Sequence, residues 1–514
     1  WDSLAADAIV IRTVGRDLVL AGGRPRGTLY AVYTFLEEAV GCRWWASDGS
    51  YVPRKARLAV PGLNISYAPS IRYREAYYRD PMENPLFAAK LKLNGNFYNI
   101  PESFGGHYSI IGWCHTFYAW LPPATYFADH PGWYSERGGK RSPDGGQICL
   151  TNADALAEMT RVVLDEVRKN PSAGIISVSQ NDWHGRCECA NCLAFEEKEG
   201  SPAGPLIAFV NSVAEAVGKE FPEVLVETLA YQYTRKPPAT VRPRENVVVR
   251  LCTIECNFGE PLTHESNQGF YDDMRGWSAV APNLYVWDYV TDFLNYLIPH
   301  PNLRVLAPNL RFFERNKTIG MFEQGDGKSA VGDFVRLRTW LLARLMWDPA
   351  QDPRELTREF LNGYYGAAGP YLEKYLDLVH DARDKAHTRI SCYHQHTDYL
   401  TFDDVQEAMR LMNAAADAVA GNRVLAERVR RDRLTLDHVW LLRFDALKAE
   451  AEKRDVKLEG PTDERAAARE FLDTARRHSA GNYSEGQPFD AYAVSIEARY
   501  AGPPPAPGEL NSIV

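Results

Sequence analysis

A short apolar run that ends in an acidic residue decides the fold, and residues 247–255, which read VVVRLCTIE, are its clearest example. Three β-branched residues in a row are typical of a strand that is buried on both faces. Three further runs have the same form: residues 174–182 read GIISVSQND, residues 284–288 read LYVWD and residues 320–323 read GMFE. Helical stretches separate these runs, so the pattern indicates βα units around a parallel sheet.

Eight such runs lie between about residues 70 and 325, which fits one barrel of about 250 residues. We expect strands at residues 73–78, 96–98, 148–150, 175–179, 225–230, 247–254, 284–287 and 321–322. The predicted fold class is therefore α/β, with a (β/α)8 TIM-type barrel at residues 67–332.

Different patterns flank the predicted barrel. Residues 8–21 alternate apolar and polar side chains, and the glycine-rich turn at residues 22–27 precedes an apolar helix face, which predicts a small N-terminal α/β domain at residues 1–66. From residue 333 onward, hydrophobic residues recur at three-and-four spacing, which predicts a C-terminal helical domain at residues 333–514. The proline-rich tail from Ala501 is expected to be extended.

Composition excludes several classes of partner. The chain has 514 residues and a net charge of −9 without a long run of Lys or Arg, so a nucleic-acid partner is not expected. No apolar run approaches the ~18–20 residues of a membrane helix, so no membrane span is expected. Aromatic residues make up 12% of the chain, and rings near strand ends could stack on sugars, although core packing is the favoured explanation for any single one.

Acidic residues that directly follow buried strands are the candidates for chemistry. A buried carboxylate is costly unless it is paired or faces a cavity, and in a (β/α)-barrel the reactive groups lie where strands end. A helix cap or an arginine partner could explain one acid, but four at equivalent positions predict one acidic pocket. These four residues are Asp182, Glu255, Asp288 and Glu323. Paired carboxyl groups are the residues that cleave glycosidic bonds.

Other side chains could bind the sugar. Trp183, Tyr231 and Trp287 offer flat faces near the strand ends, and each is a predicted substrate-binding residue. His115, in a loop after the second or third strand, could bond a sugar hydroxyl or be a structural histidine. No cofactor is predicted.

The tightest cysteine cluster is Cys187-x-Cys189-x-x-Cys192, just beyond Asp182, with His184 nearby. Such a cluster could hold zinc. The paired CxxC arms of common zinc sites are absent, which favours a local disulfide and a free thiol over a metal. In either case we expect the cluster to brace the loop after Asp182, and no catalytic metal is predicted.

Together these motifs resemble glycoside hydrolase family 163 and its uncharacterised relatives, over about residues 8–380. The most specific stretches are residues 177–182 with the cysteine cluster, 250–256, 284–289 and 299–302. Residues 19–37 resemble the small α/β domain that precedes the barrel in β-hexosaminidases and α-glucuronidases. The Trp347-Asp348-Pro349 segment and residues 360–366 resemble the helices that follow the barrel in those enzymes.

This resemblance implies an endo-β-N-acetylglucosaminidase that acts on N-glycan-type chains, with retention and with help from the substrate's own acetamido group. It also implies a secreted, periplasmic or cell-surface location. β-Hexosaminidases carry adjacent Asp-Glu after the fourth strand, whereas this chain has Asn181-Asp182. Either Asn181 orients the acetamide and Asp182 is the acid, or Asp182 orients it and Glu255 is the acid; the longer reach of Glu favours the second.

Two other functions remain open at this point. A glycosidase of different specificity, such as an exo-β-N-acetylgalactosaminidase or an α-glucuronidase, would share the barrel, but a uronidase needs a cation for the substrate carboxylate and none is evident at the strand ends. A catalytically silent glycan-binding protein would keep the aromatic rings without needing four acids.

Overall fold

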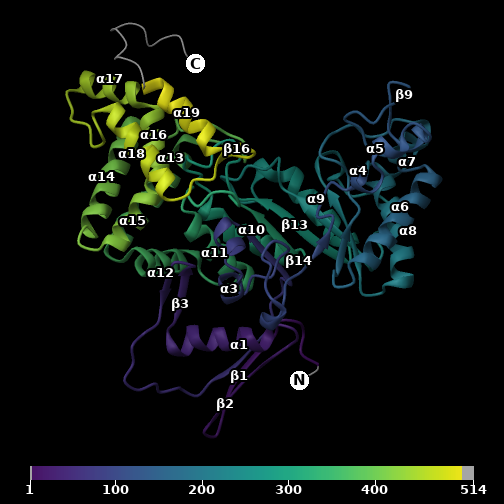
Figure 1. Ribbon diagram of the computed structural model, residues 1–514, viewed down its shortest axis with the longest axis horizontal. Helices are drawn as coiled ribbons and strands as arrows, with labels where there is room; N and C mark the ends of the chain where they lie inside the picture. Colours follow the sequence, from purple (N-terminus) through teal and green to yellow (C-terminus); the bar gives the residue numbers. More distant parts are fainter. Residues whose placement is uncertain (1–2, 501–514) are drawn as a thin grey trace.

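A computed structural model describes residues 3–500 (Figure 1). Within that range, the central feature is a curled seven-stranded sheet in which every neighbouring pair is parallel. In spatial order its strands are β6 (Tyr73–Tyr77), β14 (Thr318–Gln324), β13 (Asn283–Tyr289), β12 (Val247–Cys252), β11 (Leu225–Ala230), β10 (Ile175–Ser177) and β7 (Ile110–Ile111). The sheet is TIM-like, as the alternation of apolar runs and helices predicted.

Two of the eight expected strands are absent from the described sheet. Residues 94–98 are irregular and lie between the two edge strands: the Asn94 amide donates to Arg74 O at 3.1 Å, and the Tyr108 amide donates to Asn94 O at 2.8 Å. Asn and Gly in this segment favour turns over strands. Residue 148 forms only an isolated antiparallel bridge with Tyr134. The two-residue strand β7, which takes part in the sheet, was missed because it is too short to show periodicity.

Helices cover the outside of the sheet. They include α6 (Ala153–Lys169), α8 (Ala203–Glu220), α9 (Gln268–Val280), α10 (Leu303–Arg315) and α11 (Val335–Trp347). Helix α6 begins where the Asn152 side chain accepts from the Ala155 amide at 2.9 Å, and it buries Met159, Val163 and Val167 at four-residue spacing. Helix α8 packs on β11, α10 on β14 and α11 on β6.

A small antiparallel sheet precedes the large one. Its order is β2 (Asp17–Gly22), β1 (Ile9–Val14) and β5 (Asn64–Tyr67), and α1 (Gly27–Phe35) packs on β1 and β2 (Figure 1). The buried Asp7 carboxylate joins this unit to the large sheet, since it pairs at 2.9 Å with Arg26 and at 2.9 Å with Arg74 of β6. Moving β6 away from the N-terminal segment would break the pair between Asp7 and Arg74. Because a buried charge that loses its partner is destabilising, this pair holds β6 to the N-terminal segment.

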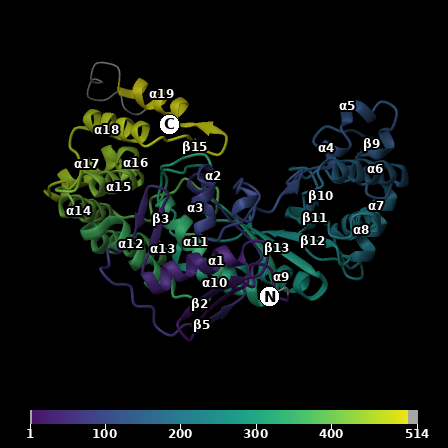
Figure 2. The same ribbon diagram turned by 60° about the horizontal axis from the view of Figure 1, so that its bottom comes forward.

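Residues 353–500 are mainly helical. The helices are α12 (Pro353–Tyr365), α13 (Gly369–Ala386), α14 (Phe402–Ala418), α15 (Arg423–Asp432), α16 (Leu434–Leu442), α17 (Phe444–Arg454), α18 (Glu464–Arg477) and α19 (Phe489–Tyr500). Figure 2 shows them gathered at the opposite side of the molecule from α6, α7 (Ala190–Glu199) and α8. The expected extended tail from Ala501 lies outside the described residues. Among residues 3–500, no helix is both long and apolar enough to cross a membrane.

A hairpin among these helices returns to the large sheet. It consists of β15 (Asn482–Ser484) and β16 (Gln487–Pro488), and Figure 1 shows it close to the centre of the molecule. The Tyr296 amide donates to Tyr483 O at 3.0 Å, and the Glu485 amide donates to Phe293 O at 2.8 Å. The hairpin therefore rests on the loop that follows β13.

The remaining elements are short and lie in the connections. They are β3 (Arg43–Ala46), β4 (Gly49–Tyr51), β8 (Glu136–Arg137), β9 (Lys140–Arg141), α2 (Arg79–Glu83), α3 (Pro85–Lys90), α4 (Phe117–Trp120), α5 (Pro123–Tyr126) and α7 (Ala190–Glu199).

Candidate active site

Aromatic side chains fill the inner face of the curled sheet. The Tyr285 ring lies over Gly320 of the neighbouring strand, where a Cβ atom would come within 2.7 Å of the ring, and its centroid is 5.5 Å from that of Tyr73. Trp287 and Phe322, one pleat further along, are 4.9 Å apart. Because side chains alternate between the faces of a strand, odd-numbered residues of β13 point inward.

Trp113 closes this interior near the carboxyl ends of the strands. It lies in the loop after β7, where Trp113 and His115 adopt positive φ angles of 59° and 54°. The Trp113 ring centroid is 4.8 Å from that of Phe322 and 5.7 Å from that of Trp287. Trp287 is therefore buried beneath Trp113 and does not offer the open flat face that the sequence suggested. Strained backbone in non-glycine residues is concentrated at functional sites, which draws attention to this loop.

A buried ionic layer lies under Trp113. Arg250 of β12 pairs with Glu227 of β11 at 3.3 Å, and its guanidinium carbon is 4.5 Å from the centre of the Trp113 ring. Glu75 of β6 accepts hydrogen bonds from the Tyr73 hydroxyl and from two backbone amides of residues 96 and 97, and burial raises its pKa to about 7. These charged groups are fully enclosed, so they support the site from below.

Asp182 is the acid that stands open at the mouth of the sheet. Its side chain is 61% exposed, and its Oδ1 atom accepts a hydrogen bond of 3.0 Å from the Tyr231 hydroxyl. The same hydroxyl accepts from Gln232 Nε2 at 2.9 Å, so its proton is directed to Asp182. His115 Nδ1 lies 2.8 Å from Gln180 O, which leaves Nε2 facing Asp182 Oδ1 at 3.9 Å. The arrangement is a carboxylate whose orientation is set by a hydrogen bond from a phenol, with an imidazole facing it at a longer distance.

Asn181, by contrast, is used to hold the loop. Its side chain is buried, accepts from the Tyr118 amide at 3.2 Å and donates to Gly146 O at 3.1 Å. The Gln147 side-chain oxygen accepts a hydrogen bond from the Asn181 amide at 2.8 Å. Its side-chain nitrogen donates to Asn181 O at 3.0 Å and to Trp183 O at 2.7 Å. Residues 181–183 are therefore fixed on both sides of Asp182. Trp183 is 40% exposed, and its indole nitrogen donates to Gly146 O.

Glu255 lies at the same end of the sheet, after β12. Its side chain is 43% exposed and pairs with Arg235 at 2.9 Å, while Arg235 also pairs with Asp273 at 2.7 Å. The Glu255 carbonyl accepts from Arg389 at 2.6 Å. The carboxylate can thus reach solvent, but one of its oxygens already has a cationic partner.

Asp288 and Glu323 lie at the expected end but do not open onto the expected pocket. They are register partners on β13 and β14, and they are only 2% and 1% exposed. They occupy the sheet face opposite Trp287 and Phe322, because strand residues alternate. Asp288 Oδ1 accepts from the Thr253 hydroxyl at 2.6 Å, and burial raises the pKa of both carboxyls. The expectation that acids at strand ends face the barrel interior is wrong for these two residues, because each lies one position away from an inward-facing residue of its strand.

Two side chains from the helical region join the mouth, and sequence reasoning did not find them. Tyr393 and Glu485 meet where the Tyr393 hydroxyl donates to Glu485 Oε2 at 3.3 Å. Partial burial of the Glu485 carboxyl raises its pKa, and the negative charge of Asp182 adds to the shift. Tyr393 follows a segment that lies along the barrel loops, since the Phe293 amide donates to Cys392 O at 2.8 Å. The only sequence signal was an unusual cluster of aromatic and histidine residues at 393–396.

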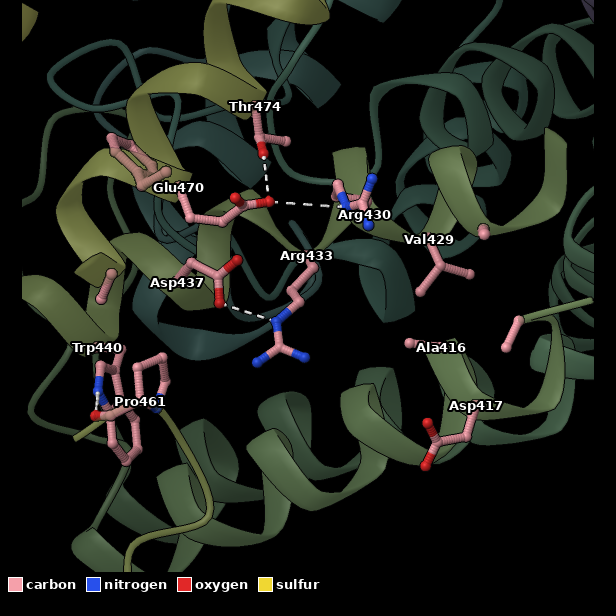
Figure 3. Close-up of a pocket in the computed structure, with 14 residues that line it drawn as sticks. Ala416, Asp417, Val429, Arg430, Arg433, Asp437, Trp440, Pro461, Glu470 and Thr474 are labelled. Carbon is pink, nitrogen blue, oxygen red and sulfur yellow. Dashed lines mark hydrogen bonds and ion pairs between the residues drawn. The ribbon is translucent and has the colours of Figure 1, made fainter. Parts of the chain in front are cut away.

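A separate cavity of about 460 Å³ lies among the C-terminal helices (Figure 3). In it, Arg433 pairs with Asp437 at 2.9 Å and Glu470 lies 3.8 Å from Arg430. Its lining comes from α14, α15, α16, α18 and the preceding loop, and no strand-end acid contributes to it. Because none of the acids that follow the strands lines it, this cavity is not the candidate active site.

Comparison with known protein families assigns this chain to a family. A family profile described as "Domain of unknown function (DUF4838)" matches residues 44–377, which is well over half of the chain. The chain belongs to the DUF4838 family. The matched range includes every strand of the large sheet together with Asp182 and Glu255, while Tyr393 and Glu485 lie beyond it. No curated protein sequence matches this DUF4838 protein.

Solved structures resemble it in fold. A family 89 glycoside hydrolase from Clostridium perfringens, solved with PUGNAc, has a TM-score of 0.54 at 9% identity, with 91% of this chain and 61% of that chain covered. A variant of that enzyme, solved with its substrate GlcNAc-alpha-1,4-galactose, has a TM-score of 0.52 at 9% identity and covers 91% and 60%. A family 138 enzyme that targets pectin rhamnogalacturonan II has a TM-score of 0.41 at 9% identity, covering 96% and 73%. The DUF4838 protein thus spans about three fifths of the family 89 enzyme.

Proposed function

We propose that this protein is a glycoside hydrolase that cleaves β-linked N-acetylhexosaminides of the N-glycan type, with retention and with participation of the substrate's 2-acetamido group. The observation that carries the proposal is the exposed Asp182 carboxylate, held by Tyr231 and faced by His115 at the carboxyl end of a TIM-like sheet. That end is where (β/α)-barrel enzymes place their reactive groups. The protein would act on glycans outside the cell or at its surface.

In this proposal Asp182 binds and polarises the acetamide nitrogen while the acetamide oxygen attacks the anomeric carbon. The Tyr231 hydroxyl fixes the carboxylate so that it needs no reorientation during the reaction. Glu255 delivers a proton to the leaving oxygen and later takes one from water. Asn181 keeps the loop in place instead of contacting the sugar, because its amide is already bonded to Gly146 and Tyr118.

Glu485 is a second candidate for the proton donor. A general acid is favoured by a raised pKa, and partial burial raises the pKa of the Glu485 carboxyl beside Asp182. Glu255 carries an ion pair with Arg235 that would have to loosen. The two residues come from different elements, so single substitutions separate them.

A panel of aryl glycosides tests the proposal. N-acetyl-β-glucosaminide, N-acetyl-α-glucosaminide, N-acetyl-β-galactosaminide, β-glucoside and α-glucuronide should be compared with an intact N-glycan. We expect turnover only where a 2-acetamido group is present and the linkage is β. Because the family 89 enzyme in the comparisons takes GlcNAc-alpha-1,4-galactose, turnover of the α anomer is the informative alternative. Glycan binding without turnover of any substrate would make the protein a binding module and refute the proposal.

Leaving-group dependence then assigns the roles. Replacing the acid (Glu255→Gln or Glu485→Gln) should depress turnover most for a poor leaving group, because such a group needs the proton. Asp182→Asn should depress all substrates alike, since the carboxylate acts on the attacking acetamide. Glu373→Gln, which removes one partner of a surface ion pair with Arg358, is the matched control. If the Asp182 variant is the one rescued by a good leaving group, Asp182 is the acid.

A further inference from the structure

Four cysteine side chains converge beside the loop that carries Asp182. The Sγ atoms of Cys149, Cys187, Cys189 and Cys192 all lie within 4.8 Å of one another, and all four residues are buried. The sequence indicated three of them. Cys149 comes from the segment that follows the β8–β9 hairpin and joins the cluster only in the folded chain.

The spacing of the sulfur atoms matches a metal site and not a disulfide. Cys149 Sγ is 3.7 Å from Cys189 Sγ and 3.9 Å from Cys192 Sγ. A disulfide requires about 2.05 Å between the sulfurs. Four thiolates placed tetrahedrally at about 2.3 Å from a zinc ion lie about 3.8 Å apart. The two separations from Cys149 match two edges of such a tetrahedron, and the remaining sulfur pairs lie within 4.8 Å of one another.

Neighbouring donors are arranged as a thiolate site needs them. The Glu136 amide and Arg141 Nη1 each approach Cys187 Sγ at 3.4 Å, and Thr151 Oγ1 lies 3.3 Å from Cys192 Sγ. Cys189 is the N-cap of α7, where backbone amides favour negative charge. Hydrogen bonds of this kind orient thiolate ligands and offset the negative charge of a four-cysteine centre.

We propose that Cys149, Cys187, Cys189 and Cys192 bind one Zn²⁺ ion in a closed structural site. Four protein ligands leave no open position for water or substrate, and the four cysteines are each buried, with at most 7% of their surface exposed. The ion thus cross-links the segment of Cys149 to residues 187–192 and takes no part in bond cleavage.

The zinc site also positions the catalytic loop, a step that rests on the proposed function. Gln147 lies two residues before Cys149 and holds Asn181 and Trp183 through three hydrogen bonds. The Gln147 amide donates to Gly185 O at 3.0 Å, two residues before Cys187. A metal ion bound by both Cys149 and Cys187 therefore fixes the two segments, around Gln147 and Gly185, that hold the loop carrying Asp182.

Metal analysis of the purified full chain tests the binding itself. We expect one zinc per chain by inductively coupled plasma mass spectrometry, and a tetrahedral four-sulfur shell by X-ray absorption. Cys149→Ser and Cys192→Ser should each reduce the zinc content severalfold, whereas Cys42→Ser, a buried cysteine outside the cluster, should retain it. Replacement with Co²⁺ should give the visible bands of a tetrahedral thiolate complex in the wild type and not in Cys149→Ser.

Thiol counting on the wild type keeps the proposal falsifiable if the cysteine variants fail to fold. Denaturation with a chelator should release the zinc and expose all nine cysteines to a thiol reagent. Seven reactive thiols would reveal a disulfide, and a chain that stays metal-free after zinc is supplied would overturn the site. Iron in place of zinc would overturn the choice of metal. These measurements need no substrate, so their outcome is independent of whether the protein proves to be a glycosidase.

Discussion

The hydrogen bond from Tyr231 to Asp182 makes a quantitative prediction. Tyr231→Phe removes one hydroxyl and leaves the ring in its buried position. A hydrogen bond to a charged group contributes about 1.5–3 kcal/mol, and the low end applies because Asp182 is 61% exposed and water can replace the lost donor. A loss of about 1.5 kcal/mol in transition-state stabilisation corresponds to about a tenfold fall in kcat/KM.

The assay is kcat/KM on the best N-acetylhexosaminide of the panel, with the melting temperature measured in parallel. Tyr134→Phe is the control, because the Tyr134 hydroxyl is also buried and donates to Leu121 O at 3.1 Å, but away from Asp182. We expect the control to keep its kcat/KM. An unchanged kcat/KM in Tyr231→Phe, or an equal fall in both variants, would show that the hydroxyl does not orient a catalytic carboxylate.

Two further predictions concern stability and need no substrate. Asp288→Asn keeps an acceptor for the Thr253 hydroxyl and the Tyr289 amide but cannot ionise. Burial raises the pKa of Asp288 in the folded state, so the wild type loses stability as the pH rises from the ordinary carboxyl range through that raised pKa. Urea unfolding at about pH 5 and about pH 8 should show the variant gaining stability relative to the wild type at the higher pH, and a relative loss there would contradict this. Arg250→Met leaves Glu227 buried without a cation and should lower the free energy of unfolding by about 3–5 kcal/mol. Adding Glu227→Gln should recover part of that loss, and a double variant no more stable than the single one would argue against the pairing.

The candidate site was predictable to the extent that a residue's place along a strand determines its place in space. Asp182 and Glu255 follow strands and do stand exposed at the carboxyl end of the sheet. Asp288 and Glu323 satisfy the same pattern, but each lies inside its strand by one position, so the alternation of side chains turns it to the opposite face. A run of apolar letters does not specify the exact residue at which a strand ends.

Local sequence determined the parallel sheet, because β-branched runs separated by amphipathic helices can bury their surfaces in few other ways. It also determined that Cys187, Cys189 and Cys192 lie close together, since they share one loop and helix turn. Only the tertiary structure brought Cys149 to that cluster and carried Tyr393 and Glu485 to the mouth of the sheet. These contacts join residues about 40 to 300 positions apart, and they depend on how whole elements pack, which no local pattern of side chains encodes.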